Sequence, residues 1–161
     1  MSLYQFLASN SKMKDRLNPN VEFLSIEEAE NRGIQLPDWY QKDMEIDRQA
    51  KNVLFCLSEE GLYDLEIKED NDFIQAKTYS NKKYFSYLTL RYTESRAQEL
   101  INYISKHLEV ASDIELWSTW FDEHKAPIIK SCHIATLTVS DLKETIGRSY
   151  YERPHCLLVK R

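Results

Sequence analysis

Two short segments near the C-terminus place a cysteine beside a histidine, Cys132–His133 and His155–Cys156. Thiolates and imidazoles are zinc ligands, but all four must lie within about 2.0–2.3 Å of one ion. Adjacent residues of a strand point to opposite faces of a sheet, so one strand offers only one member of each pair. Because the chain also lacks a Cys-x-x-Cys sequence, we predict no metal site.

The same residue types are those of a nucleophile and its base. Each of the three cysteines can be paired on paper with a histidine, but sequence spacing does not say which side chains meet. Neighbouring carboxylates, such as Glu59–Glu60, lie beside predicted turns, where charged side chains are usually solvated. If the chain were catalytic, Cys132, His133 and Tyr87 would be the first candidates, since all three fall in predicted strands.

The chain holds only three glycines, Gly33, Gly61 and Gly147, and no two of them are close in sequence. Loops that wrap a pyrophosphate need residues without Cβ, because the backbone must approach the phosphate closely. A dinucleotide-binding glycine pattern, a P-loop and a nucleophile elbow are therefore excluded. We expect no cofactor.

Charge and cysteine content limit the classes of binding partner and the cellular compartment that we expect. The formal net charge is −5 and the sequence pI about 5.4, whereas proteins that bind nucleic acid usually present a basic surface. No apolar run is long enough to span a membrane, and the N-terminus lacks a secretion-signal pattern. An odd number of cysteines favours reduced thiols. We expect a cytoplasmic protein that binds neither nucleic acid nor membrane.

The last 80 residues carry the clearest structural pattern. Thr93 or Ser95 caps an amphipathic helix, and Thr138 caps a shorter one that ends at Gly147. With four apolar strands, the order is βαββαβ, which predicts an α+β, ferredoxin-like antiparallel sheet in strand order 4-1-3-2 with both helices on one face. The predicted strands are residues 84–92, 114–121, 128–137 and 155–160, and the predicted helices residues 94–109 and 139–146.

We predict a single domain of residues 1–161. Its first 83 residues form segments that are added to the βαββαβ core. Residues 1–50 form a helical N-terminal extension, in which Ser25 opens a capping box and Gly33 ends the helix. Residues 51–83 are a β-hairpin, made of the runs 53–57 and 62–67, followed by a polar connection.

Both faces of the predicted strands are apolar, although a half-solvated sheet alternates between apolar and polar. Something must cover the second face: residues 1–50 with Trp39 and Tyr40, a second copy of the chain, or another partner or ligand. An RNA-stacking sheet is disfavoured because residues 129–136 contain neither glycine nor Phe, Tyr or Trp. The candidate binding residues on the sheet are Phe85, Tyr87, Trp117, Phe121 and His133.

These observations favour a non-catalytic protein that binds another protein, such as a small acidic inhibitor of the immunity-protein kind. An acidic surface attracts basic partners, and tyrosines are common in interfaces. A homodimer joined through a sheet face is a further possibility. The alternative function is a small-molecule-binding or catalytic ferredoxin-like domain that uses the open sheet face.

Overall fold

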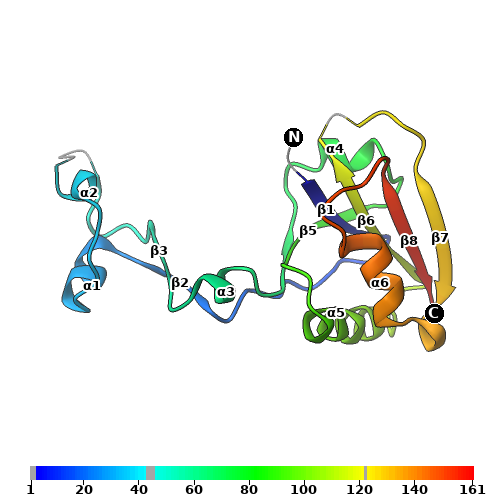
Figure 1. Ribbon diagram of the computed structural model, residues 1–161, viewed down its shortest axis with the longest axis horizontal. Coiled ribbons are helices and arrows are strands. Elements are labelled where there is room, and N and C mark those ends of the chain that lie inside the picture. Colours follow the sequence, from blue (N-terminus) through cyan, green and yellow to red (C-terminus); the bar gives the residue numbers. More distant parts are fainter. Residues whose placement is uncertain (1–2, 43–45, 122) are drawn as a thin grey trace. The chain divides into compact units, whose positions relative to one another are not determined.

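The computed structural model describes residues 3–42, 46–121 and 123–161 and is a mixed α+β protein (Figure 1). It divides into two compact units: Asn18–Tyr63, here called the inserted unit, and Met1–Leu17 with Asp64–Arg161, here called the sheet unit. The strands are β1 Leu3–Ser9, β2 Val21–Leu24, β3 Val53–Cys56, β4 Glu66–Glu69, β5 Tyr84–Thr89, β6 Asp113–Trp120, β7 Ile128–His133 and β8 His155–Lys160. The helices are α1 Ile26–Asn31, α2 Asp38–Lys42, α3 Glu59–Leu62, α4 Ile74–Lys77, α5 Glu94–His107, the short 3-10 helix Ile134–Thr136 and α6 Val139–Ile146.

The sheet unit is built on a six-stranded, mostly antiparallel sheet in the order β4-β5-β1-β6-β8-β7. This order differs from the predicted ferredoxin-like 4-1-3-2, and the strand count differs as well. The last strand, β8, lies between β6 and β7, and β7 runs parallel to it. Helix α6 makes the crossover between these two strands, and a parallel pair requires such a connection.

The largest correction concerns residues 3–9, which the sequence analysis placed in a helical N-terminal extension. They form β1, which pairs with β5 on one side and β6 on the other. β1 therefore lies between β5 and β6, so these two strands are not neighbours in the sheet. Its alternating side chains serve both faces of the sheet: Leu7 belongs to the core beneath the helices, while Phe6 and Ala8 belong to the opposite face.

The two long helices lie on the same face of the sheet, as predicted (Figure 1). Thr93 caps α5 by accepting a hydrogen bond from the Arg96 amide, and Thr138 opens a capping box on α6 with Asp141. Their apolar sides share one core with the strands, which includes Leu100, Ile104, Leu116, Leu142 and Leu157.

The second sheet face is covered, within the sheet unit, by residues 73–79, which the sequence analysis placed in a polar connection. Phe73 stacks on Phe85 with ring centroids 5.5 Å apart, Tyr79 contacts Trp117, and Ala76 is fully buried. The expected cover was residues 1–50 with Trp39 and Tyr40. Those two rings belong to the inserted unit, where they stack on each other at 3.8 Å.

The inserted unit has its own small core around the two-stranded sheet β2–β3, formed by Leu24, Ile26, Ala29 and Val53. Helix α1 begins at the Ser25 capping box and ends before Gly33, whose φ of 71° lies in the left-handed region, as predicted. The proline at position 37 also predicts a second short helix, from Asp38 to about Met44. The structure has α2 at Asp38–Lys42, and the predicted end near Met44 falls outside the described residues.

The predicted hairpin of residues 53–67 is wrong. β3 pairs with β2, and β4 pairs with β5 in the other sheet. The residues between them form α3 rather than a turn, because the Ser58 hydroxyl accepts a hydrogen bond from the Gly61 amide and acidic residues occupy the first helical turn.

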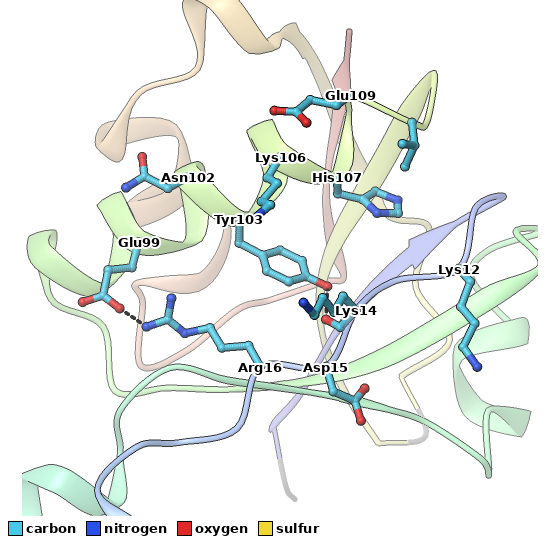
Figure 2. A pocket seen from close by; sticks show the side chains of 11 residues that line it. Lys12, Lys14, Asp15, Arg16, Glu99, Asn102, Tyr103, Lys106, His107 and Glu109 are labelled. Carbon is cyan, nitrogen blue, oxygen red and sulfur yellow. Dashed lines mark hydrogen bonds and ion pairs between the residues drawn. The ribbon is translucent and has the colours of Figure 1, made fainter.

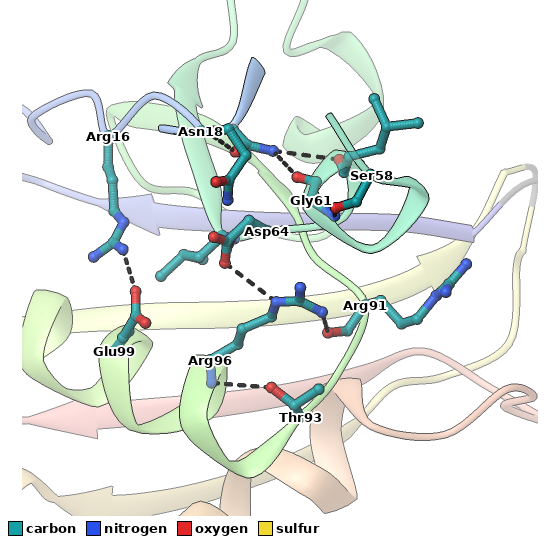
Figure 3. A network of polar contacts seen from close by, with 12 residues as sticks. Arg16, Asn18, Ser58, Gly61, Asp64, Arg91, Thr93, Arg96 and Glu99 are labelled. Carbon is teal, nitrogen blue, oxygen red and sulfur yellow. Dashed lines mark hydrogen bonds and ion pairs between the residues drawn. The ribbon is translucent and has the colours of Figure 1, made fainter. Parts of the chain in front are cut away.

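A buried asparagine ties the two ends of the inserted unit together (Figure 3). The Asn18 side-chain amide donates to the backbone carbonyl oxygens of Gly61, at 2.8 Å, and of Leu62, at 3.3 Å. Closing the ends in this way allows a 46-residue unit to be inserted between β1 and β4, two strands of one sheet.

Candidate functional site

The structure brings together only part of the predicted site. Phe85 and Trp117 lie on the second sheet face but are each 2% exposed under residues 73–79. Tyr87 and Phe121 remain about two-fifths exposed, and each contacts the ring of Tyr4, with centroid distances of 5.5 and 5.3 Å. His133 lies on the edge strand β7, where its Nδ1 accepts a hydrogen bond from the Ala135 amide, and it joins none of these rings.

Tyr4, which the sequence analysis did not single out, organises this aromatic cluster. Its hydroxyl donates to the Asp70 carboxylate at 2.7 Å, and both residues are buried. The pKa of Tyr4 and that of Tyr87 are raised above the ordinary value. Burial is the larger cause, and the nearby Asp70 carboxylate is the smaller one. Within this cluster Tyr4, Phe85 and Trp117 are buried, whereas Tyr87 and Phe121 present exposed aromatic surface.

A serine beside a histidine and two of the three cysteines are each poorly suited to act as a nucleophile. Ser9 lies 2.8 Å from His107 Nε2, the spacing of a nucleophile and its base, but Ser9 is fully buried and a substrate has no access to it. Burial raises the pKa of the Cys132 and Cys156 thiols, which disfavours the nucleophilic thiolate. Among the described residues, no group of three or more His, Cys, Asp or Glu side chains is placed to hold a metal ion.

The outer face of the two-stranded sheet β2–β3 exposes large apolar side chains. Alternate residues of the strands face the core of the inserted unit, and the remaining ones face outward. Phe23 and Leu54 are direct cross-strand partners on the outward side and are 54% and 52% exposed. Val21 and Cys56 form the next cross-strand pair on that side. We call these four residues the outer strand face.

The apolar surface continues beyond the strand ends. Leu57, which follows β3 directly, is 91% exposed. It lines a hollow of about 210 Å³ together with Pro19, Val21 and Cys56. Leu24 and Val53, one residue away from Phe23 and Leu54, are buried in the core instead. The exposed apolar side chains are therefore surplus to what the inserted unit needs for its own folding.

The acidity of the chain resides in this same unit. Residues 18–63 hold ten Asp and Glu against four Lys and Arg, a formal charge of −6, whereas the rest of the chain holds 17 basic and 16 acidic residues, a charge of +1. Sequence reasoning gave only the total. The division became visible once the boundaries of the units were known.

A second feature of the sheet unit is a groove of about 540 Å³ between residues 12–16 and the outer side of α5 (Figure 2). Its lining combines the ring of Tyr103 with the charged side chains of Lys14, Arg16, Glu99 and Lys106. Nothing in the sequence pattern indicated it, because residues 12–16 are an irregular polar segment that β1 brings alongside the helix.

Comparison with protein-family models, with curated protein sequences and with solved structures gave no match. In the described part of the chain, no helix is both long and apolar enough to cross a membrane.

Proposed function

We propose that the chain is a non-catalytic binding protein whose inserted unit binds a basic protein through the outer strand face. One observation carries the proposal: a pair of apolar side chains, Phe23 and Leu54, stands exposed at the centre of a strand pair in a unit of net charge −6. Contiguous exposed apolar surface is typical of interaction sites. Fully buried apolar anchors surrounded by polar residues supply most of the binding energy in protein interfaces.

Charge selects the kind of partner. A second copy of the same unit would bring together two units that each carry a formal charge of −6, which opposes a homodimer through this face. Nucleic acid is repelled for the same reason. A basic protein surface is attracted over a distance of about 10 Å at ordinary salt and adds to the apolar contact.

The specific form of this proposal is an inhibitor of the immunity-protein kind, which blocks a basic enzyme by covering its surface. A cytoplasmic location belongs to the same proposal. It is supported by the three free thiols, Cys56, Cys132 and Cys156, which fit a reducing compartment. The alternative of a small molecule bound on the open sheet face has little room, since Phe73 and Tyr79 occupy much of that face.

The test uses the full chain as bait in an extract of the cells that make it. The variant Phe23→Thr/Leu54→Thr removes the apolar pair and puts β-branched threonines, which favour strands, in its place. The control, Ile74→Thr, removes an apolar side chain that is 77% exposed on α4. The captured protein is identified, purified and titrated against each variant.

We expect a partner of basic pI whose affinity falls at least about tenfold with the double variant and by less than about twofold with the control. Raising the salt from about 0.1 to about 0.5 M should weaken binding of the unaltered chain. A partner of acidic pI would contradict the proposal. So would equal binding by a double variant whose amide NMR spectrum shows it folded.

A further inference from the structure

The groove beside α5 is held open by contacts that do not depend on a ligand. The Tyr103 hydroxyl donates to the backbone carbonyl of Lys14 at 2.7 Å, and Arg16 forms an ion pair with Glu99. Arg16 also exchanges backbone hydrogen bonds with Ile67 of β4, and Met13 is buried in the main core. Residues 12–16 are thus anchored through Met13, Lys14 and Arg16, and the groove is pre-formed.

Its size and lining suit a small molecule. The volume, about 540 Å³, falls within the usual range of ligand pockets, about 300–1,000 Å³. Figure 2 shows the flat ring of Tyr103 lying between Lys14 and Lys106, with Arg16 turned toward Glu99. Val110 adds an apolar side chain near the C-terminal end of the helix. A planar apolar body would stack on the ring, in the way that aromatic groups pair in proteins.

The charges that remain unpaired favour an anion. Arg16 is neutralised by Glu99, Lys12 lies 3.4 Å from Glu69, and Asp15 accepts a hydrogen bond from the Glu69 amide. Within the described residues, Lys14 and Lys106 take part in no ion pair, and Glu109 is the one lining carboxylate without a partner. Burial raises the pKa of Tyr103 to about 12, so the phenol adds no negative charge at neutral pH.

We propose that this groove binds an organic anion, a flat apolar ring system that carries a carboxylate, sulfonate or phosphate group. The ring lies against Tyr103, and Lys14 and Lys106 hold the anionic group. The site is distinct from the outer strand face of the inserted unit, and the proposal does not depend on the proposed protein partner.

The probe is anilinonaphthalene sulfonate, a fluorescent aromatic anion, and the matched ligand is phenylnaphthylamine, which has the same rings without the sulfonate. Both are titrated against the full chain, against Lys14→Gln/Lys106→Gln and against the control Lys68→Gln/Lys143→Gln. The control loses the same charge from exposed lysines that do not line the groove. Amide NMR spectra locate the bound probe on each protein.

We expect the anion to bind with saturation and to shift amides of residues 12–16 and 99–110. The groove variant should weaken its binding about tenfold and leave the neutral amine unaffected, while the control changes neither. Equal loss in both lysine variants would overturn the proposal, as would equal affinity for the two probes. Shifts confined to residues 21–24 and 53–57 would place the probe on the outer strand face and also overturn it.

Discussion

The hydroxyl of Tyr4 donates a hydrogen bond to the Asp70 carboxylate over 2.7 Å, joining residues 66 positions apart in the sequence. Asp70 is 3% exposed, and its other oxygen accepts from the Asp72 amide at 2.9 Å. This contact links the central strand β1 to the segment that leads from β4 into α4. It therefore fixes the start of the cover over the second sheet face.

Replacing Tyr4 with Phe should destabilise the sheet unit by about 1–3 kcal/mol, because a buried carboxylate loses a hydrogen-bond donor while the ring packing is kept. Denaturant unfolding measures the change. Tyr150→Phe is the control, since that residue is 65% exposed, and it should change stability by less than about 0.5 kcal/mol. Equal effects of the two variants would show that the bond to Asp70 contributes no net stability.

Substitutions at two adjacent positions, 73 and 74, test whether residues 73–79 cover the second sheet face. Phe73 stacks on Phe85, whereas Ile74 is 77% exposed. Phe73→Ala should cost about 1–3 kcal/mol of unfolding free energy through lost apolar burial, and Ile74→Ala less than about 0.5 kcal/mol. If thermal unfolding ranked the two variants the other way round, residues 73–79 would not be the cover.

Helices with caps were predictable, and strand partners were not. Ser25, Thr93 and Thr138 each signal a helix start through a local hydrogen bond, and all three helices begin where the sequence indicates. Strand order depends instead on contacts between distant residues. Phe6 of β1 pairs with both Tyr87 and Trp117, and nothing in the local sequence indicates these partners. The ferredoxin-like order was therefore predicted from the four C-terminal strands alone.

The candidate site shows the same limit. Tyr87 and Phe121 were selected for their residue types, and the structure leaves both partly exposed beside Tyr4. Phe23 and Leu54 become neighbours only through the register of β2 and β3, 31 residues apart in the sequence. The apolar run 53–57 contains both the buried Val53 and the exposed Leu54, so the sequence alone does not show which of its residues face outward.

The buried His107 predicts a pH dependence of stability. Burial lowers the pKa of His107 below its ordinary value of 6.5, because the imidazolium loses hydration. Below about pH 6.5 the unfolded chain then binds more protons than the folded one. Stability should therefore fall as the pH drops through this value and level off below the folded pKa. Burial, with Arg148 and Arg153 nearby, also lowers the pKa of His155, which adds to the same slope.

His107→Gln should reduce the loss of stability between about pH 7.5 and 5.5, and the remaining slope should include the part due to His155. The measurement is the slope of unfolding free energy against pH, which separates this effect from any constant loss of the contact with Ser9. The exposed His133→Gln serves as the control. An unchanged slope in the His107 variant would exclude this histidine as the source.

The last prediction tests whether the inserted unit opens on its own. Gly33 has a φ of 71° and an amide that donates to Glu30, and a Cβ built there meets no atom within 4 Å. The cost of Gly33→Ala is therefore purely a backbone cost, about 1–2 kcal/mol, and Gly33→Asn should cost less because asparagine tolerates the left-handed region. Native-state hydrogen exchange resolves where the cost appears. Amides of α1 and β2–β3 should lose protection, while those of β1 and β6 should keep theirs, because local unfolding follows compact units. Equal loss throughout the chain would mean that the two units unfold as one.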